Sequence, residues 1–155
     1  MNGVFYDTWA FVALANRRDP DHLAAADADR DLEARGRVAI TSDYVFDETL
    51  TLVHTSAGAD AALAVADALL AQIEGTELML IDVTAARRER AVALFRKLAP
   101  DTPRLSFTDC TSFAIMAELG VDAAFTADAH FHRPGGTIRP LFSRASRGLV
   151  YSPPE

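Results

Sequence analysis

The sequence predicts an α/β protein built around a parallel sheet. Short apolar stretches of strand length alternate with longer stretches of helical periodicity, which is the pattern of repeated strand–helix–strand units. With 155 residues, half of them hydrophobic and 24% charged, the chain is long enough for one core and has an ordinary globular composition. We therefore expect one folded domain.

Four stretches are apolar and too short for helices. In chain order, they are residues 4–6, 38–41, 78–83 and 123–126. A turn is expected at 132–136, followed by a last strand at 138–142. Pro140 restricts that strand to the edge of the sheet, because proline cannot donate a ladder hydrogen bond. The polar, basic residues 143–155 are expected to fray.

The segments between these strands carry apolar residues at helical spacing, preceded by residues that cap helices. The predicted helices begin at Asp7 or Thr8, near Pro20, at Ser42 or Asp43, at residue 61, at Thr84, and at Thr108 or Asp109. Glycines end four of them, at Gly36, Gly58, Gly75 and Gly120.

The chain carries a net charge of −7, so it lacks the basic field of a protein that binds nucleic acid through its overall charge. A nucleic-acid partner would have to be held by local arginines or by a cation that bridges carboxylate and phosphate. No stretch is long and apolar enough for a membrane span. The N-terminus lacks the basic region of a secretory signal, so a cytoplasmic protein with no membrane partner is expected. The single Cys110 excludes an intramolecular disulfide.

Four acidic residues fall at the ends of predicted elements. Asp7 and Asp128 follow the first and fourth strands, and ligands of open parallel sheets bind at the carboxyl ends of the strands. Glu48 and Asp109 lie near the beginnings of helices, where the helix dipole favours an anion. If the four carboxylates converge, a divalent cation relieves their repulsion, and oxygen ligands of this kind suit Mg²⁺ or Mn²⁺. Such a site can activate water for attack on a phosphodiester.

Each acid also has a simpler interpretation as a helix cap, which applies to Asp109 in particular. Asp47 competes with Glu48, because adjacent helical residues point about 100° apart and only one can face the site. Hydroxyl groups accompany three of the acids and are candidates for support. They are Thr8 beside Asp7, Thr126 before Asp128, and Thr108 and Ser106 around Asp109.

Four segments together resemble the PIN domain family and, within it, the VapC-like toxins of bacterial toxin–antitoxin pairs. These segments are FYDTWAFVAL, TSDYVFDETLTLV, LSFTDCTSFAIM and VDAAFTADAHF. The resemblance extends from Val4 to about Leu141. It implies a three-layer α/β/α sandwich with a central parallel sheet and a metal-dependent endoribonuclease activity with Mg²⁺ or Mn²⁺ as cofactor. On this basis residues 1–142 form a PIN-like nuclease domain and residues 143–155 a C-terminal tail.

The resemblance also implies the catalytic and metal-binding set. It matches Asp7, Glu48, Asp109 and Asp128 to the four acids of the family, and it selects Glu48 over Asp47. Thr8 and Thr126 match small hydroxyl positions that support the first and fourth acids. RNA as substrate, a cognate antitoxin and a homodimer are the partners that the family implies.

Arginines are the candidates for contact with RNA. Arg87 lies with Arg88 and Arg90 on one predicted helix, and such a charge pattern is more typical of a solvated helix face. Arg133 lies nearer the fourth acid.

Other classes fit less well. Haloacid-dehalogenase-type phosphatases need a second aspartate two residues after the first, where this chain has Trp9, and receiver domains need an acidic pair before their phosphorylated aspartate. A zinc site from Asp128, His130 and His132 is a further alternative. A PIN nuclease outside a toxin–antitoxin pair and a PIN module that binds without cleaving also stay open.

Overall fold

The computed structural model describes residues 1–132 and 137–155 and contains a five-stranded parallel sheet. Its strands are β1 (Gly3–Tyr6), β2 (Val38–Ser42), β3 (Leu78–Ile81), β4 (Ala123–Phe125) and β5 (Arg139–Pro140). The order across the sheet is β3-β2-β1-β4-β5, and every neighbouring pair is parallel. The prediction of an α/β protein with a central parallel sheet is therefore confirmed.

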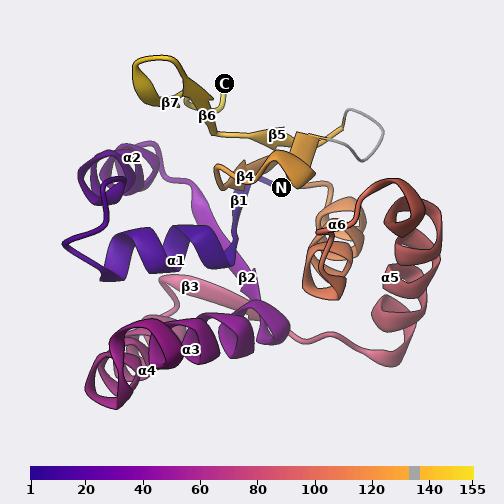
Figure 1. The fold of residues 1–155 in the computed structure, drawn as a ribbon, viewed down its shortest axis with the longest axis horizontal. Coiled ribbons are helices and arrows are strands. Elements are labelled where there is room, and N and C mark those ends of the chain that lie inside the picture. Colours follow the sequence, from indigo (N-terminus) through magenta and orange to yellow (C-terminus); the bar gives the residue numbers. More distant parts are fainter. Residues whose placement is uncertain (133–136) are drawn as a thin grey trace.

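Helices cover both faces of the sheet (Figure 1). They are α1 (Thr8–Ala15), α2 (His22–Ala34), α3 (Asp43–Ala57), α4 (Ala59–Glu74), α5 (Ala85–Leu98) and α6 (Phe107–Leu119). In Figure 1, α1 and α2 lie on one side of the sheet and α5 and α6 on the other. The paired helices α3 and α4 lie on the α1 side, and α3 contacts both α1 and α6.

The strand order places the switch point of the sheet between β1 and β4. The chain builds β1, β2 and β3 in one direction and then returns to add β4 and β5 on the other side of β1. The loops that leave β1 and β4 therefore diverge to opposite faces and open a crevice at the carboxyl edge of the sheet. Asp7 leaves β1 at this point, and Asp128 lies in the loop that leaves β4.

Buried aromatic side chains hold the centre of the sheet together. Tyr6 of β1 stacks on Phe125 of β4 with ring centroids 4.6 Å apart, and Phe142 packs against Phe125 at 5.0 Å. Trp9, at the beginning of α1, contacts Phe142 at 5.0 Å. The strand ends that carry the acids therefore rest on a rigid apolar base.

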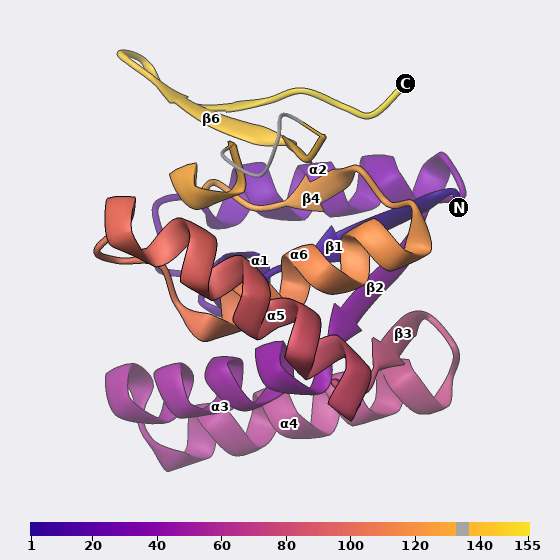
Figure 2. The ribbon, with the colours of Figure 1, turned by 90° about the vertical axis from the view of Figure 1, so that its right-hand side faces the viewer.

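The C-terminal residues differ from the prediction. Instead of fraying, they form an antiparallel hairpin of β6 (Phe142–Ala145) and β7 (Gly148–Tyr151), which packs alongside α2 (Figure 2). This segment has few apolar residues, but the apolar contacts of Phe142 and the polar contacts with α2 stabilise the hairpin. The predicted edge strand at 138–142 is correspondingly divided between β5 and β6.

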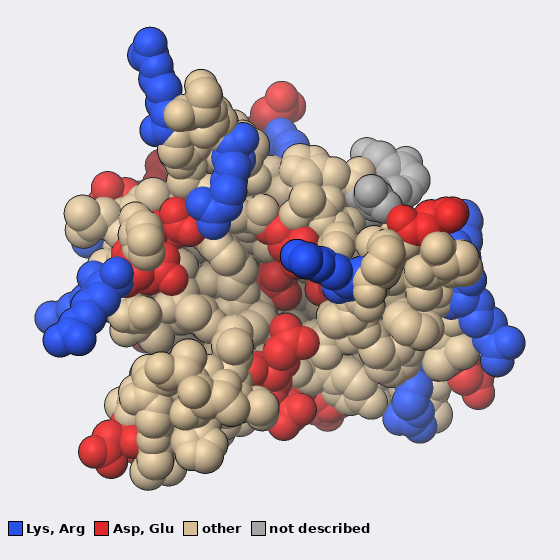
Figure 3. All heavy atoms as spheres, viewed as in Figure 1, with Lys and Arg blue, Asp and Glu red and all other residues tan. Residues whose placement is uncertain are grey.

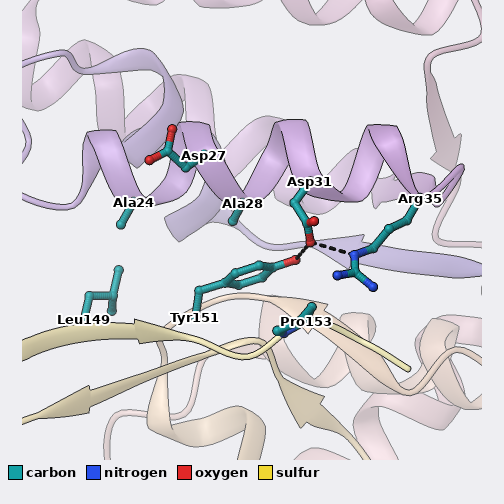
Figure 4. A pocket seen from close by; sticks show the side chains of 8 residues that line it. All are labelled: Ala24, Asp27, Ala28, Asp31, Arg35, Leu149, Tyr151 and Pro153. Carbon is teal, nitrogen blue, oxygen red and sulfur yellow. Dashed lines mark hydrogen bonds and ion pairs between the residues drawn. The ribbon is translucent and has the colours of Figure 1, made fainter.

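The hairpin and α2 enclose a shallow pocket of about 410 Å³, drawn in Figure 4. On its wall, the Tyr151 hydroxyl donates a hydrogen bond of 2.9 Å to Asp31 Oδ2. Arg35 Nε donates to the same oxygen at 2.8 Å. On β6, Arg144 forms an ion pair of 2.7 Å with Asp21. These contacts fix the tail to the helix that precedes β2.

Smaller differences concern element ends. Helix α6 begins earlier than predicted, because its N-cap is Ser106 rather than Thr108 or Asp109. β3 ends at Ile81, and α2 begins at His22 rather than near Pro20. Most of the predicted turn at 132–136 lies outside the described residues. Among the residues described, no helix has the length and apolar character needed to cross a membrane.

Candidate metal centre

Asp7 lies at the carboxyl end of β1 and is the N-cap of α1, but its side chain makes no capping hydrogen bond. Only 4% of its surface is exposed. Its Oδ2 accepts a hydrogen bond of 3.1 Å from the Thr126 hydroxyl. The capping interpretation therefore does not explain this carboxylate, which is buried without a positively charged partner among the described residues.

Asp109 lies in the first turn of α6 and does cap the helix. Ser106 N donates to Asp109 Oδ2 at 3.1 Å, and Asp109 N donates to the Ser106 hydroxyl at 3.0 Å, which together form a capping box. Asp109 is also 5% exposed, far less than a surface cap. The capping box therefore fixes the orientation of a carboxylate that faces the interior.

Asp128 is held by the loop that leaves β4. Its backbone N–H donates to the Thr126 hydroxyl at 3.0 Å, and its Oδ1 accepts from His130 N at 2.9 Å. Its side chain is 36% exposed, so it is the acid of this group that solvent reaches most easily. Thr126 thus contacts both strand-end acids, whereas the sequence had paired it with Asp128 alone.

His130 joins the acids, although the sequence grouped it only with Asp128 and His132, as an alternative zinc site, and not with Asp109. Its Nδ1 lies 3.4 Å from Asp109 Oδ2 and 3.3 Å from Asp128 Oδ1. Ligand atoms of Asp109, Asp128 and His130 all lie within 4.8 Å of one another. The zinc alternative combined His130 with Asp128 and His132, but His132 is exposed and Asp109 takes its place. The sequence signal for His130 was the His-x-His pattern that it forms with His132.

Burial and mutual repulsion raise the pKa values of these carboxyls. Burial is the larger cause for Asp7, and the nearby Asp109 and Asp128 add to it, so that its pKa rises to about 7 despite hydrogen bonds from Thr8 and Thr126. Burial, with a contribution from Asp128, also raises the pKa of Asp109. The site is therefore short of positive charge, and a bound cation would stabilise its ionised form.

Glu48 lies on α3 and shares a groove with the beginning of α6. It lines a groove of about 440 Å³ together with Asp47, Thr51, Thr108 and neighbouring residues. Thr108 precedes Asp109 on α6, so the groove joins Glu48 to the first turn of that helix. Within the described part of the chain, neither Glu48 nor Asp7 is among the three residues whose ligand atoms lie within 4.8 Å of one another, although the charges of Asp109 and Asp128 raise the pKa of Asp7. Asp47 is exposed and Glu48 is half-buried, which favours Glu48 as the member that faces the site.

The two threonines proposed as supports beside Thr126 have different surroundings. Thr8 is 5% exposed, and its hydroxyl has no hydrogen-bond partner within the described part of the chain. The backbone N–H of Thr8 instead donates to Asp7 and lowers its pKa. The carbonyl of Thr108 accepts hydrogen bonds from Thr111 and Ser112 inside α6.

Of the two arginines proposed for RNA, the structure describes only Arg87, which contacts the far end of α6 from the acids. Arg87 forms a two-pronged ion pair with Glu118 in the last turn of α6, whereas Asp109 lies in the first turn. Its guanidinium also donates to the carbonyl of Asp82 at 2.6 Å. Arg87 therefore joins α5 to α6. Arg133 lies outside the described residues.

Acidic side chains gather in a hollow at the centre of the face seen in Figure 3, between the helices on either side of the sheet. This is the face onto which the carboxyl ends of the parallel strands open (Figures 1 and 2). Oxygen ligands from two strand ends and one helix, with an adjacent imidazole nitrogen, form a donor set that fits a divalent cation.

Comparisons with known proteins place the chain in a family. Residues 4–136 match the model of the PIN domain. The chain is 33% identical over 138 residues to the 23S rRNA-specific endonuclease VapC20 of Mycobacterium tuberculosis. The aligned region covers 88% of this chain and 98% of the relative.

Two solved structures have a similar fold. The crystal structure of M. tuberculosis VapC20, described as a sarcin-ricin loop cleaving toxin, matches with a TM-score of 0.68 at 33% identity, over 81% of this chain and 90% of that one. VapBC2 from Rickettsia felis, bound to a DNA fragment from its promoter, matches with a TM-score of 0.63 at 17% identity, over 88% of this chain and 97% of that one. The second match supports the fold.

Proposed function

Because the chain belongs to the PIN domain family, we propose that it is a divalent-metal-dependent endoribonuclease that hydrolyses phosphodiester bonds of RNA. The observation that carries this proposal is the convergence of Asp7, Asp109 and Asp128 at the switch point of the sheet, without a positively charged arginine or lysine partner within the described residues. A donor set of this kind suits Mg²⁺ or Mn²⁺.

In this proposal Asp7, Asp109 and Asp128 hold the cation, and Glu48 approaches from α3. When bound, the cation would lower the pKa of a water molecule and offset the negative charge that develops on the phosphodiester. The residues of the chain supply the orientation. Thr126 fixes Asp7 relative to the loop of Asp128, and the capping box fixes Asp109. The exposed side of Asp128 leaves the site open to a polymer.

RNA is the substrate class that the relative supports, since VapC20 is a 23S rRNA-specific endonuclease and its crystal structure is described as a sarcin-ricin loop cleaving toxin. We extend this to the present chain and propose the sarcin-ricin loop as its first substrate to test. A net charge of −7 gives little general attraction for RNA, so binding would depend on local contacts and on the cation.

We further propose that the chain is the toxin of a toxin–antitoxin pair and acts in the cytoplasm. A basic side chain from an antitoxin tail would be attracted to the acidic hollow and would compete with the cation there.

A homodimer is also proposed, because Leu63 and Leu70 of α4 are 63% and 55% exposed and would be buried by a second copy. Light scattering of the purified chain measures its molar mass in solution and so distinguishes a dimer from a monomer.

The test is cleavage of a sarcin-ricin-loop oligonucleotide in Mg²⁺ and in EDTA. Wild type should cleave only with Mg²⁺, and Asp7→Asn should lose cleavage. Glu48→Gln should reduce the rate about 10- to 100-fold, as loss of a group that supports a metal site does. Its matched control is Asp47→Asn, an exposed acid one residue away on the same helix, which should cleave like wild type.

Two results would contradict the proposal. If Asp7→Asn cleaves as fast as wild type in Mg²⁺, the acidic cluster is not the catalytic site. If wild type binds the oligonucleotide and leaves it intact at every Mg²⁺ concentration, the chain is a PIN module that binds without cleaving.

A further inference from the structure

The imidazole of His130 is directed at two carboxylates of the acidic hollow, the buried Asp109 and the more exposed Asp128. Its Nδ1 lies 3.4 Å from Asp109 Oδ2 and 3.3 Å from Asp128 Oδ1. The atom is buried, and it has no hydrogen-bond partner among the described residues, because neither approach has the geometry of a hydrogen bond. A buried ring nitrogen without a partner costs free energy, so its position requires an explanation.

Local structure holds the ring in this place. The backbone N–H of His130 donates to Asp128 Oδ1 at 2.9 Å, which closes a tight turn around the acid. The next residue, Phe131, is fully buried and packs edge-on against Phe113 of α6 at 5.0 Å. His130 is therefore fixed between a turn and a core anchor, and its side chain is only 21% exposed. Such a ring is positioned in advance, as a metal ligand needs to be.

The chemistry of the donor set distinguishes two explanations. A protonated imidazole would serve as a cation for Asp109 and Asp128 and would compete with a metal ion. A neutral imidazole, with the lone pair of Nδ1 facing the same point as the carboxylate oxygens, would instead add a nitrogen ligand. Mg²⁺ binds oxygen ligands and keeps much of its water, whereas transition-metal ions accept imidazole nitrogen readily.

We propose that His130 Nδ1 is a ligand of the cation held by Asp109 and Asp128, and that the site therefore prefers Mn²⁺ to Mg²⁺. This inference rests on the proposed function for the presence of the cation. It goes further in assigning a nitrogen ligand and a metal preference to a residue outside the four acids. It also explains why the ring nitrogen is buried without a hydrogen bond.

The direct test is pulsed electron paramagnetic resonance of the purified protein with Mn²⁺ alone, together with calorimetric titration by Mn²⁺ and by Mg²⁺. Wild type should show coupling between Mn²⁺ and an imidazole ¹⁴N nucleus, and it should bind Mn²⁺ at least about 10-fold more tightly than Mg²⁺. His130→Ala and His130→Gln should both lose the coupling and bind Mn²⁺ about 10-fold more weakly, with little change for Mg²⁺. Circular dichroism checks that the two variants are folded.

The matched control is His132→Ala, which removes an exposed imidazole two residues away and should keep both the coupling and the affinity. Bound Mn²⁺ without nitrogen coupling would overturn the inference, as would equal affinities for the two ions or no binding of either. Tighter Mn²⁺ binding by His130→Ala would assign the imidazole to the role of competing cation.

Failure of this inference is distinguishable from failure of the proposed function. If the protein cleaves RNA with Mg²⁺ and binds Mn²⁺ without nitrogen coupling, the proposed function stands and the assignment of His130 as a ligand is wrong. If the protein shows the coupling, but its Asp7→Asn variant cleaves RNA like wild type, His130 is a ligand and the proposed function of the acidic site is wrong.

Discussion

Thr126 joins the two strand ends of the acidic hollow through its contact with Asp7. Its hydroxyl donates a hydrogen bond of 3.1 Å to Asp7 Oδ2, and the hydroxyl oxygen accepts the backbone N–H of Asp128 at 3.0 Å. One buried side chain, with no exposed surface, therefore sets the position of both acids. The orientation of the site depends on this hydroxyl as much as on the carboxylates that it contacts.

Replacing Thr126 by Val keeps the shape of the side chain and removes both hydrogen bonds. The free energy of unfolding should fall by about 1–3 kcal/mol, because Asp7 and the N–H of Asp128 lose a buried partner. Affinity for Mn²⁺ should fall about 10- to 100-fold, as for other groups that orient ligands. Urea denaturation and calorimetry measure the two effects. Thr126→Ser keeps the hydroxyl and should retain most of the affinity, and an equal loss in both variants would assign the effect to packing.

The raised pKa of Asp7 predicts how stability depends on pH in the absence of divalent cations. Folding raises this pKa from 3.8 to about 7, chiefly by burial and then by repulsion from Asp109. Between these values the folded state binds more protons than the unfolded state, so the free energy of unfolding should fall as pH rises from about 4 to about 7. At about 1.4 kcal/mol per pKa unit, the loss is of the order of 4 kcal/mol.

Urea denaturation in EDTA at pH 5 and pH 8 tests this dependence. Asp7→Asn cannot ionise at this position, so it should lose less stability than wild type between the two pH values and should be the more stable protein at pH 8. Asp47→Asn, which removes an exposed acid, should follow wild type. Parallel behaviour of Asp7→Asn and wild type would mean that Asp7 is already ionised in the folded protein at pH 5.

The sequence predicted the position of a site residue where that residue closely follows a strand. Asp7 and Asp128 follow apolar strands, and parallel topology brings the carboxyl ends of strands to one edge, so their proximity could be predicted without coordinates. The position of His130 was not predictable in this way. It depends on a turn around Asp128 and on the burial of Phe131, and the two candidates His130 and His132, two residues apart, look alike in the sequence.

The C-terminal hairpin shows a second limit of the sequence. Ser143–Tyr151 contains few apolar residues, and a two-stranded hairpin is marginal on its own. Its stability comes from contacts with residues distant in the chain. Phe142 packs on Trp9 and Phe125, and Tyr151 donates a hydrogen bond to Asp31 of α2. Arg87 is a further example, because the sequence did not predict that its guanidinium binds Glu118 of α6, 31 residues away.

The last prediction concerns the apolar anchor of the hairpin. Phe142 is 1% exposed and contacts the rings of Trp9, Phe125 and Tyr151, so Phe142→Ala leaves a cavity beneath the hairpin. The free energy of unfolding should fall by about 3–5 kcal/mol. The matched control is Arg144→Ala on the same strand. It removes an exposed ion pair with Asp21 and should cost about 1 kcal/mol or less.

Urea denaturation of the full chain measures both values. Because Trp9 packs on Phe142 and directly follows Thr8 and Asp7, the Phe142→Ala variant should also bind Mn²⁺ more weakly, whereas Arg144→Ala should not. A Phe142→Ala variant as stable as wild type would mean that the C-terminal residues do not pack on the domain in solution. A destabilised variant with unchanged Mn²⁺ affinity would instead confine the role of the hairpin to stability.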